Sequence, residues 1–203
     1  MSMEFLLTTL IIVASPGTGA IYTLAAGLSG GMRASVVAAF GCTLGIIPHL
    51  LAAISGLAAL LHASATAFQA LKWLGVAYLL YMAWSMFRER GDLRIDGALT
   101  DRSARQVIGS VILINLLNPK LSIFFFAFLP QFVTPDQTSP ITLMLKLSLV
   151  FMALTFIIFA AYGVFAAYLS RHIVSSPTVQ SWMRRSFATA FGVLAAQLAL
   201  ASR

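Results

Sequence analysis

The sequence predicts an all-α, polytopic membrane protein, and three observations carry that prediction. Of its 203 residues, 60% are hydrophobic and only 9% are charged. The mean hydropathy is +0.92, far above the values of soluble domains. The apolar residues form runs of helix length that recur along the whole chain. A lipid bilayer is therefore the expected surrounding of most of the protein.

Six apolar runs are each interpreted as one membrane-spanning helix, since about 20 apolar residues cross the hydrocarbon of a bilayer. The first run is expected to be retained and not cleaved as a secretory signal, because Met1–Glu4 holds no basic residue. Segments rich in Gly, Ser and Pro separate most runs and predict turns, among them Ser29–Gly31. The six predicted helices are Phe5–Leu28, Ala34–Leu61, Ala67–Phe87, Gln106–Val133, Ile141–Leu169 and Ser186–Ala201.

A polar segment, Arg88–Arg105, joins halves 1–87 and 106–203 of a single transmembrane domain that spans residues 1–203. The segment carries four of the six acidic residues and five arginines, so it is predicted to be a solvated linker. Loops expected on the same side hold most of the other arginines. The positive-inside rule then places the linker in the cytoplasm and both termini in the periplasm. The net charge of +7 is scattered over segment ends, whereas a protein that binds nucleic acid gathers such charge on one face.

Each half contains three predicted helices, so a repeat of one half in the other would be inverted across the membrane. The first helix of each half carries a proline midway, Pro16 and Pro119. The third carries a Gly-Val pair near its start, at Gly75 and Gly192. These echoes favour a 3+3 inverted repeat in which helices 1 and 4 are broken.

The candidate substrate-binding residues lie at these two breaks. Proline removes a backbone donor, and glycine lets the chain leave helical angles. Two interpretations remain open for each break: a kinked but continuous helix, and a discontinuous helix whose backbone groups line a cavity and bind charged groups. The candidates are Pro16, Gly17 and Thr18 in the first helix and Asn118, Pro119 and Lys120 in the fourth.

Lys120 lies along its helix about 22 Å from Arg105 and about 16 Å from Gln131 at 1.5 Å per residue, too deep to snorkel to either interface. Lys72 and Lys146 lie near the outer boundary and are expected to snorkel. No Asp or Glu occurs in any of the six apolar runs. The counter-charge of Lys120 is therefore expected to be the carboxylate of a small substrate. The alternatives are a structural lysine held by backbone carbonyls, and an amine that is neutral in the empty site and takes a proton during transport.

His49 is the other titratable side chain expected near the middle of the membrane. It has a coupling or gating role or is a satisfied packing residue. Gly41 and Gly45 are expected to permit close helix packing, and the single cysteine, Cys42, excludes an intramolecular disulfide. No carboxylate pair, histidine cluster, nucleophile elbow or phosphate loop is present. No enzyme activity, catalytic residue, metal site or cofactor is therefore expected.

Several of these motifs occur in an order that resembles a known family. They are Ser15-Pro-Gly17, Gly41–Gly45 with His49, Trp73–Leu80, Asn118-Pro-Lys120 and Leu129–Val133. Over about Pro16–Val133 the chain is similar to the LysE/RhtB family of amino-acid exporters. The resemblance implies a bacterial inner-membrane exporter with six helices or nearly so, driven by proton exchange. Two departures are Thr18, where the family continues Pro-Gly-Pro, and Ile46, where many members carry an acidic residue.

We therefore expect a secondary transporter that exports amino acids or close derivatives in exchange for protons. Small neutral or apolar amino acids are favoured, because a lysine or arginine substrate would bring a second cation and find no intramembrane acid. The alternative is a non-transporting assembly or sensor subunit in which Lys120 is structural. Export of a metal cation lacks soft or anionic ligands. A homo-oligomer is left open.

Overall fold

The computed structural model describes residues 2–15, 17–61, 65–88, 103–133, 139–168 and 176–200, and the secondary structure of these segments is entirely helical. The all-α prediction is thus confirmed. The elements are α1 Met3–Ala14, α2 Thr18–Leu44, α3 Ile47–Leu61, α4 Ala65–Arg88, α5 Ala104–Leu116, α6 Pro119–Ile123, the π-helix η1 Phe124–Phe128, the 3-10 helix η2 Leu129–Phe132, α7 Pro140–Tyr168 and α9 Pro177–Leu200.

Three of the predicted helices are interrupted. The first predicted helix is divided between α1, which ends at Ala14, and α2, which begins at Thr18, and the fourth between α5 and α6 at Leu117 and Asn118. The second is also divided, between α2 and α3 at Gly45 and Ile46, where the sequence predicted a continuous helix. The last helix begins at Pro177 and not at Ser186.

The predicted linker is shorter than expected at both ends. Helix α4 continues through Arg88, and α5 begins at Ala104. Ser103 starts α5 with a capping box, because its hydroxyl accepts the Gln106 N–H while the Gln106 side chain accepts the Ser103 N–H. The linker prediction otherwise falls on residues 89–102, which lie outside the described part of the chain.

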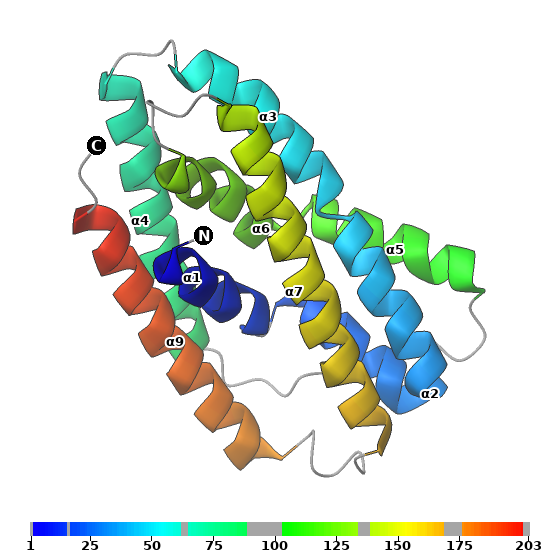
Figure 1. Cartoon of the computed structure of the whole chain (residues 1–203). Coiled ribbons are helices and arrows are strands. Elements are labelled where there is room, and N and C mark those ends of the chain that lie inside the picture. Colours follow the sequence, from blue (N-terminus) through cyan, green and yellow to red (C-terminus); the bar gives the residue numbers. More distant parts are fainter. Residues whose placement is uncertain are drawn as a thin grey trace.

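Two helix pairs dominate the packing, and each joins one half of the chain to the other. Helix α2 packs along α7 and also against α5, while α4 packs along α9. Figure 1 shows α4 and α9 side by side at the left, α7 in the middle of the view, and α2 and α5 at the right. The short helix α1 contacts both α7 and α9. Its C-terminal end therefore lies inside the bundle, where α2 begins.

Gly31 divides α2 into two arms. Its φ of 72° and ψ of −168° lie in the left-handed region that favours glycine, and the helix changes direction there (Figure 1). The turn predicted over Ser29–Gly31 is therefore present. Both arms press closely on α7: a Cβ added to Gly27 would overlap the carbonyl of Gly163, and one added to Gly163 would overlap the side chain of Ser35.

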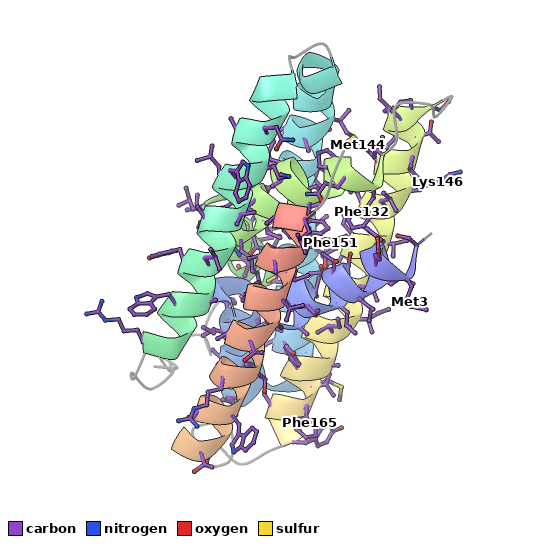
Figure 2. The ribbon with its side chains drawn as sticks, turned by 90° about the vertical axis from the view of Figure 1, so that its left-hand side faces the viewer. Met3, Phe132, Met144, Lys146, Phe151 and Phe165 are labelled. Atoms are coloured by element: carbon purple, nitrogen blue, oxygen red, sulfur yellow. The ribbon has the colours of Figure 1, made fainter. Side chains whose placement is uncertain are left out.

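The surface of α7 is apolar outward and partly polar inward. Leu149, Ile157 and Phe165 are 60–66% exposed, whereas Ser148 and Thr155 are buried. Figure 2 shows Phe165 pointing away from the bundle and Phe151 pointing into it. In water this arrangement would expose apolar side chains and bury hydroxyls. It is the arrangement expected of a helix surrounded by lipid.

Two stretches of the described chain, Thr18–Gly56 and Pro140–Tyr168, are long and apolar enough to cross a membrane. The pair Ala104–Leu116 and Lys120–Phe132, bent by 57°, makes a third if it counts as one span. The six-span prediction thus remains a prediction.

Lys72 was expected to extend to the membrane surface, but its side chain is only 7% exposed. Its ammonium group donates to the carbonyl of Ala199 in α9 at 3.2 Å and lies 5.5 Å from the centre of the Trp73 ring. The contact between α4 and α9 covers the side chain. Lys146, by contrast, is exposed and points outward (Figure 2).

Candidate functional site

Lys120 lies in α6, directly after the break between α5 and α6, and its side chain contacts the end of α1 at the first helix break. Asn118 caps α6, since its side-chain oxygen accepts the Lys120 backbone N–H at 3.0 Å. The Lys120 side chain is 8% exposed and reaches the C-terminal end of α1. Its Nζ atom donates to the carbonyl of Ile12 at 3.0 Å, to the carbonyl of Ser15 at 3.1 Å and to the Ser15 hydroxyl at 3.0 Å. We call these three oxygens the carbonyl cage.

The cage exists because α1 stops inside the bundle. The last carbonyls of a helix have no partner within it, and a buried carbonyl without a partner is costly where no water can reach it. The Ser15 N–H donates to the carbonyl of Ile11 at 3.0 Å, and the Tyr162 hydroxyl donates to that of Ala14 at 2.7 Å. The Lys120 ammonium donates to the carbonyls of Ile12 and Ser15. A cation is also favoured at a helix C-terminus by the helix dipole.

The cage matches the charged form of lysine. An ammonium group has three donors and no acceptor, and Lys120 Nζ contacts three oxygens at 3.0–3.1 Å. The Ser15 hydroxyl donates its own hydrogen to the Ile12 carbonyl at 2.7 Å, so it presents lone pairs to Lys120. A neutral amine has only two N–H donors, and it would fit these oxygens only if the Ser15 hydroxyl turned its hydrogen from the Ile12 carbonyl to the nitrogen. This conformation therefore supports the alternative in which backbone carbonyls hold a charged Lys120.

Asn115 supplies a hydrogen-bond donor to a carbonyl at the end of α2. Its side-chain NH₂ donates to the carbonyl of Cys42, in the last turn of α2, at 2.7 Å. The residue is 3% exposed and packs tightly, since a Cβ added to Gly45 would lie 2.7 Å from the Asn115 Cβ. A Cβ added to Gly41 would lie 3.1 Å from Ile108 Cα. The two glycines therefore let α2 approach α5.

His49 contacts a carbonyl at the end of α5, which also accepts the Asn118 N–H. Its Nε2 atom lies 2.9 Å from the carbonyl of Asn115, in the last turn of α5, and its Nδ1 atom lies 3.2 Å from the Ser122 hydroxyl. A carbonyl only accepts, so Nε2 must carry a hydrogen. In the neutral ring Nδ1 then accepts from Ser122, and a second proton on Nδ1 would reverse that hydrogen bond.

A small cavity lies where these helix ends meet. Its volume is about 20 Å³, enough for about one water molecule and far too little for an amino acid. Ile46, at the position where the resembled family often has an acid, also lines it. In this conformation the cavity therefore has no room for an amino-acid substrate. The polar side chains that line the cavity are Asn115, Asn118, Lys120 and Thr155, and Phe151 forms one part of the wall.

The structure gathers most of the sequence-predicted residues here. A Cβ added to Gly17 would lie 3.0 Å from Lys120 Nζ, so the bare glycine backbone gives the ammonium its room. Pro119 is the first residue of α6. Thr18 is exposed at the start of α2, and Pro16 lies outside the described residues.

Sequence reasoning missed three residues of the site: Ile12, Ser15 and Asn115. The carbonyl of Ile12 leaves no trace in the sequence, because every residue has one. Asn115 did leave one, as an amide in an apolar run three positions before Asn118. Ser15 left another, as a hydroxyl beside the predicted break.

A helical chain with an apolar outer surface, three interrupted helices and a buried ammonium at their ends defines an α-helical membrane protein with a polar centre. Comparison with known proteins gives the family. The LysE type translocator family matches residues 10–202. The chain belongs to this family of translocators.

Three relatives align with 80–97% of this chain. An uncharacterized membrane protein of Vibrio cholerae is 33% identical over 93% of this chain and 91% of its own length. The homoserine/homoserine lactone efflux protein of Salmonella typhimurium is 29% identical over 97% of this chain and 95% of its own. The leucine efflux protein of an Enterobacter strain is 28% identical over 80% of this chain and 77% of its own. No solved structure matches the chain significantly.

Proposed function

We propose that this protein is a secondary transporter that exports amino acids or close derivatives across the bacterial inner membrane in exchange for protons. The observation that carries the proposal is the ammonium of Lys120, buried where interrupted helices end. Relatives whose names state homoserine, homoserine lactone or leucine efflux support the substrate class.

In this proposal, Lys120 binds the substrate carboxylate. Glu4 is the only acidic residue in the described part of the chain, and it lies in the first turn of α1, at the opposite end from the carbonyl cage. A substrate carboxylate would therefore meet little competition for the ammonium. Asn118, at the start of α6, and the backbone at Gly17 and Thr18, at the start of α2, would supply further polar contacts.

The cavity has a volume of only about 20 Å³, so a conformational change is required before a substrate can bind. In many secondary transporters, discontinuous helices form the substrate site at the interface of two repeats, and one repeat rocks against the other to alternate the access. Here the breaks bring together segments from both halves of the chain. We propose an inverted 3+3 repeat whose halves rock about this centre, with both termini in the periplasm and the linker in the cytoplasm.

The preferred substrates in this proposal are small neutral or apolar amino acids. A zwitterion adds no net charge to the site, whereas lysine or arginine adds a cation beside Lys120. Proton exchange would use Lys120 as the coupling group, with His49 as a gating or coupling residue whose Nδ1 meets the Ser122 hydroxyl.

The test is a Lys120→Met variant in cells loaded with dipeptides, with efflux of leucine and homoserine measured against wild type. Lys146→Met is the matched control, because it makes the same replacement on the exposed side of α7. We expect Lys120→Met to abolish efflux while its abundance in the membrane stays normal, and Lys146→Met to export normally. Undiminished efflux by Lys120→Met would disprove the proposed site.

A second candidate is a non-transporting assembly or sensor subunit with a structural Lys120. The observation that favours it is that this chain alone supplies all three acceptors of the Lys120 ammonium. It predicts that wild type exports none of the amino acids in the screen. It also predicts that Lys120→Met lowers membrane abundance.

A further inference from the structure

We propose that the carbonyl cage is the binding site for the amino group of the substrate, and that Lys120 occupies it as a tethered substitute while no substrate is bound. The inference rests on the proposed function, since it assumes an amino-acid substrate. It assigns Ile12 and Ser15, at the end of α1, to ammonium recognition and assigns Lys120 two alternating partners.

The geometry of the cage is that of an ammonium site. Two carbonyls and one hydroxyl oxygen surround Lys120 Nζ at 3.0–3.1 Å. The α-ammonium of an amino acid carries the same three donors as lysine. Any primary ammonium that reaches this point can make the same hydrogen bonds.

The described part of the chain offers the substrate ammonium no carboxylate nearby, because Glu4 lies at the far end of α1. The cage instead carries the partial negative charge of a helix C-terminus. It is also already desolvated, since Ser15 is fully buried and its hydroxyl is fixed by the hydrogen bond to Ile12. Its oxygens are therefore oriented before a substrate arrives.

Lys120 has to leave the cage before a substrate ammonium can enter, and the substrate provides its new partner. The departing Lys120 ammonium meets the substrate carboxylate, while the substrate ammonium replaces it among the three oxygens. The net charge of the site stays the same throughout this exchange. Gly17 leaves space for the movement, because it has no side chain where a Cβ would lie 3.0 Å from Nζ.

The experiment uses the purified full-length Lys120→Ala variant with n-propylammonium as probe, because this ion replaces the atoms that the substitution removes. Thermal unfolding is followed as the probe concentration rises. We expect saturable stabilisation of Lys120→Ala by several degrees, and no saturable shift for wild type, whose cage is occupied. Neutral n-propanol is the control for size and Lys146→Ala the control for loss of a lysine. No response of Lys120→Ala, or an equal response of wild type, would overturn the inference.

A second variant tests the location of the probe. Ser15→Ala added to Lys120→Ala removes one of the three oxygens and should raise the half-saturating n-propylammonium concentration roughly tenfold or more, as expected for one hydrogen bond to a charged group. An unchanged concentration would place the ion elsewhere and refute the cage. Should Lys120→Ala fail to accumulate, n-propylammonium in the growth medium should restore folded protein, and a failure to restore it counts against the inference.

The outcomes separate this inference from the proposed function. Stabilisation of Lys120→Ala by the probe, with no amino-acid efflux by wild type, would keep the ammonium site and reject the exporter. Efflux by wild type without any probe response would keep the exporter and reject the cage.

Discussion

Replacing Asn115 with alanine should destabilise the protein more than removal of any peripheral hydrogen bond. The change deletes the NH₂ group that donates to the carbonyl of Cys42 at 2.7 Å. That carbonyl is in the last turn of α2, where the helix itself supplies no partner. Asn115 is 3% exposed, so water has little access to the carbonyl left behind.

The expected loss follows from that unpaired carbonyl. A buried polar group that loses its partner costs about 1–3 kcal/mol. For a chain of this length, 1 kcal/mol shifts the unfolding temperature by about 2–4 °C. Asn115→Ala should therefore lower the unfolding temperature by about 2–12 °C. The vacated space beside Gly45, whose added Cβ would lie 2.7 Å from the Asn115 Cβ, adds to the loss.

The assay is thermal unfolding of the purified variant in detergent, with Ser55→Ala as the matched control. The Ser55 hydroxyl donates to the carbonyl of Leu51 at 2.9 Å in an exposed part of α3, and that carbonyl lies in mid-helix, where it already has a backbone partner. The control should unfold within about 2 °C of wild type. If Asn115→Ala unfolds at the same temperature as Ser55→Ala, the reasoning about unpaired helix ends is refuted.

Three further variants test neighbouring contacts. Gly17→Ala places a methyl group 3.0 Å from Lys120 Nζ on an extended backbone that tolerates any residue, so efflux should fall roughly tenfold, about 1.4 kcal/mol, with little change in unfolding temperature. Gly27→Ala pushes a methyl group into the carbonyl of Gly163, and such overpacking should cost about 1–3 kcal/mol and lower the unfolding temperature. His49→Ala should cost only about 0.5–1.5 kcal/mol, less than Asn115→Ala, because the carbonyl it leaves keeps a backbone donor.

Gly192→Ala is the control for both glycine variants, because an added Cβ there meets nothing within 4 Å. Alanine is the better helix former by about 0.5–1 kcal/mol, so this variant should be neutral or slightly stabilised in thermal unfolding. Normal efflux by Gly17→Ala, or an unchanged unfolding temperature for Gly27→Ala, would contradict the close contacts inferred for these positions.

The sequence predicted two of the three helix breaks because each has a local cause. Proline lacks an N–H, and glycine relaxes the backbone, and these residues occur at 16–17 and at Pro119. The third break, at Gly45 and Ile46, has local signals of the same kind, because it contains a glycine and Pro48 lies in the first turn of α3. The close approach of Asn115 to Gly45 is a tertiary contact between segments that are distant in the sequence, and it could not be predicted from local signals.

The candidate site was predicted in part for a similar reason. Lys120 stood out because a charge in a long apolar run is rare and costly. Its acceptors did not stand out, because they are mostly backbone carbonyls. Which carbonyls meet the ammonium depends on where α1 ends in the folded bundle. The apolar runs hold no Asp or Glu, and in this conformation the Lys120 ammonium contacts the carbonyls of Ile12 and Ser15.

The three interrupted helices share one arrangement that bears on how the transporter could open. Lys120 and Asn115, from residues 106–203, satisfy the ends of α1 and α2, while His49, from residues 1–87, satisfies the end of α5. Every one of these contacts therefore joins the two halves. Moving one half against the other removes the donors of the Cys42 and Ser15 carbonyls, at about 1–3 kcal/mol each, unless another donor replaces the lost one. The carbonyls of Asn115 and Ile12 keep a donor from their own half, the Asn118 N–H and the Ser15 hydroxyl. A substrate ammonium can replace Lys120 at the end of α1. An empty transporter would thus resist opening more than a loaded one.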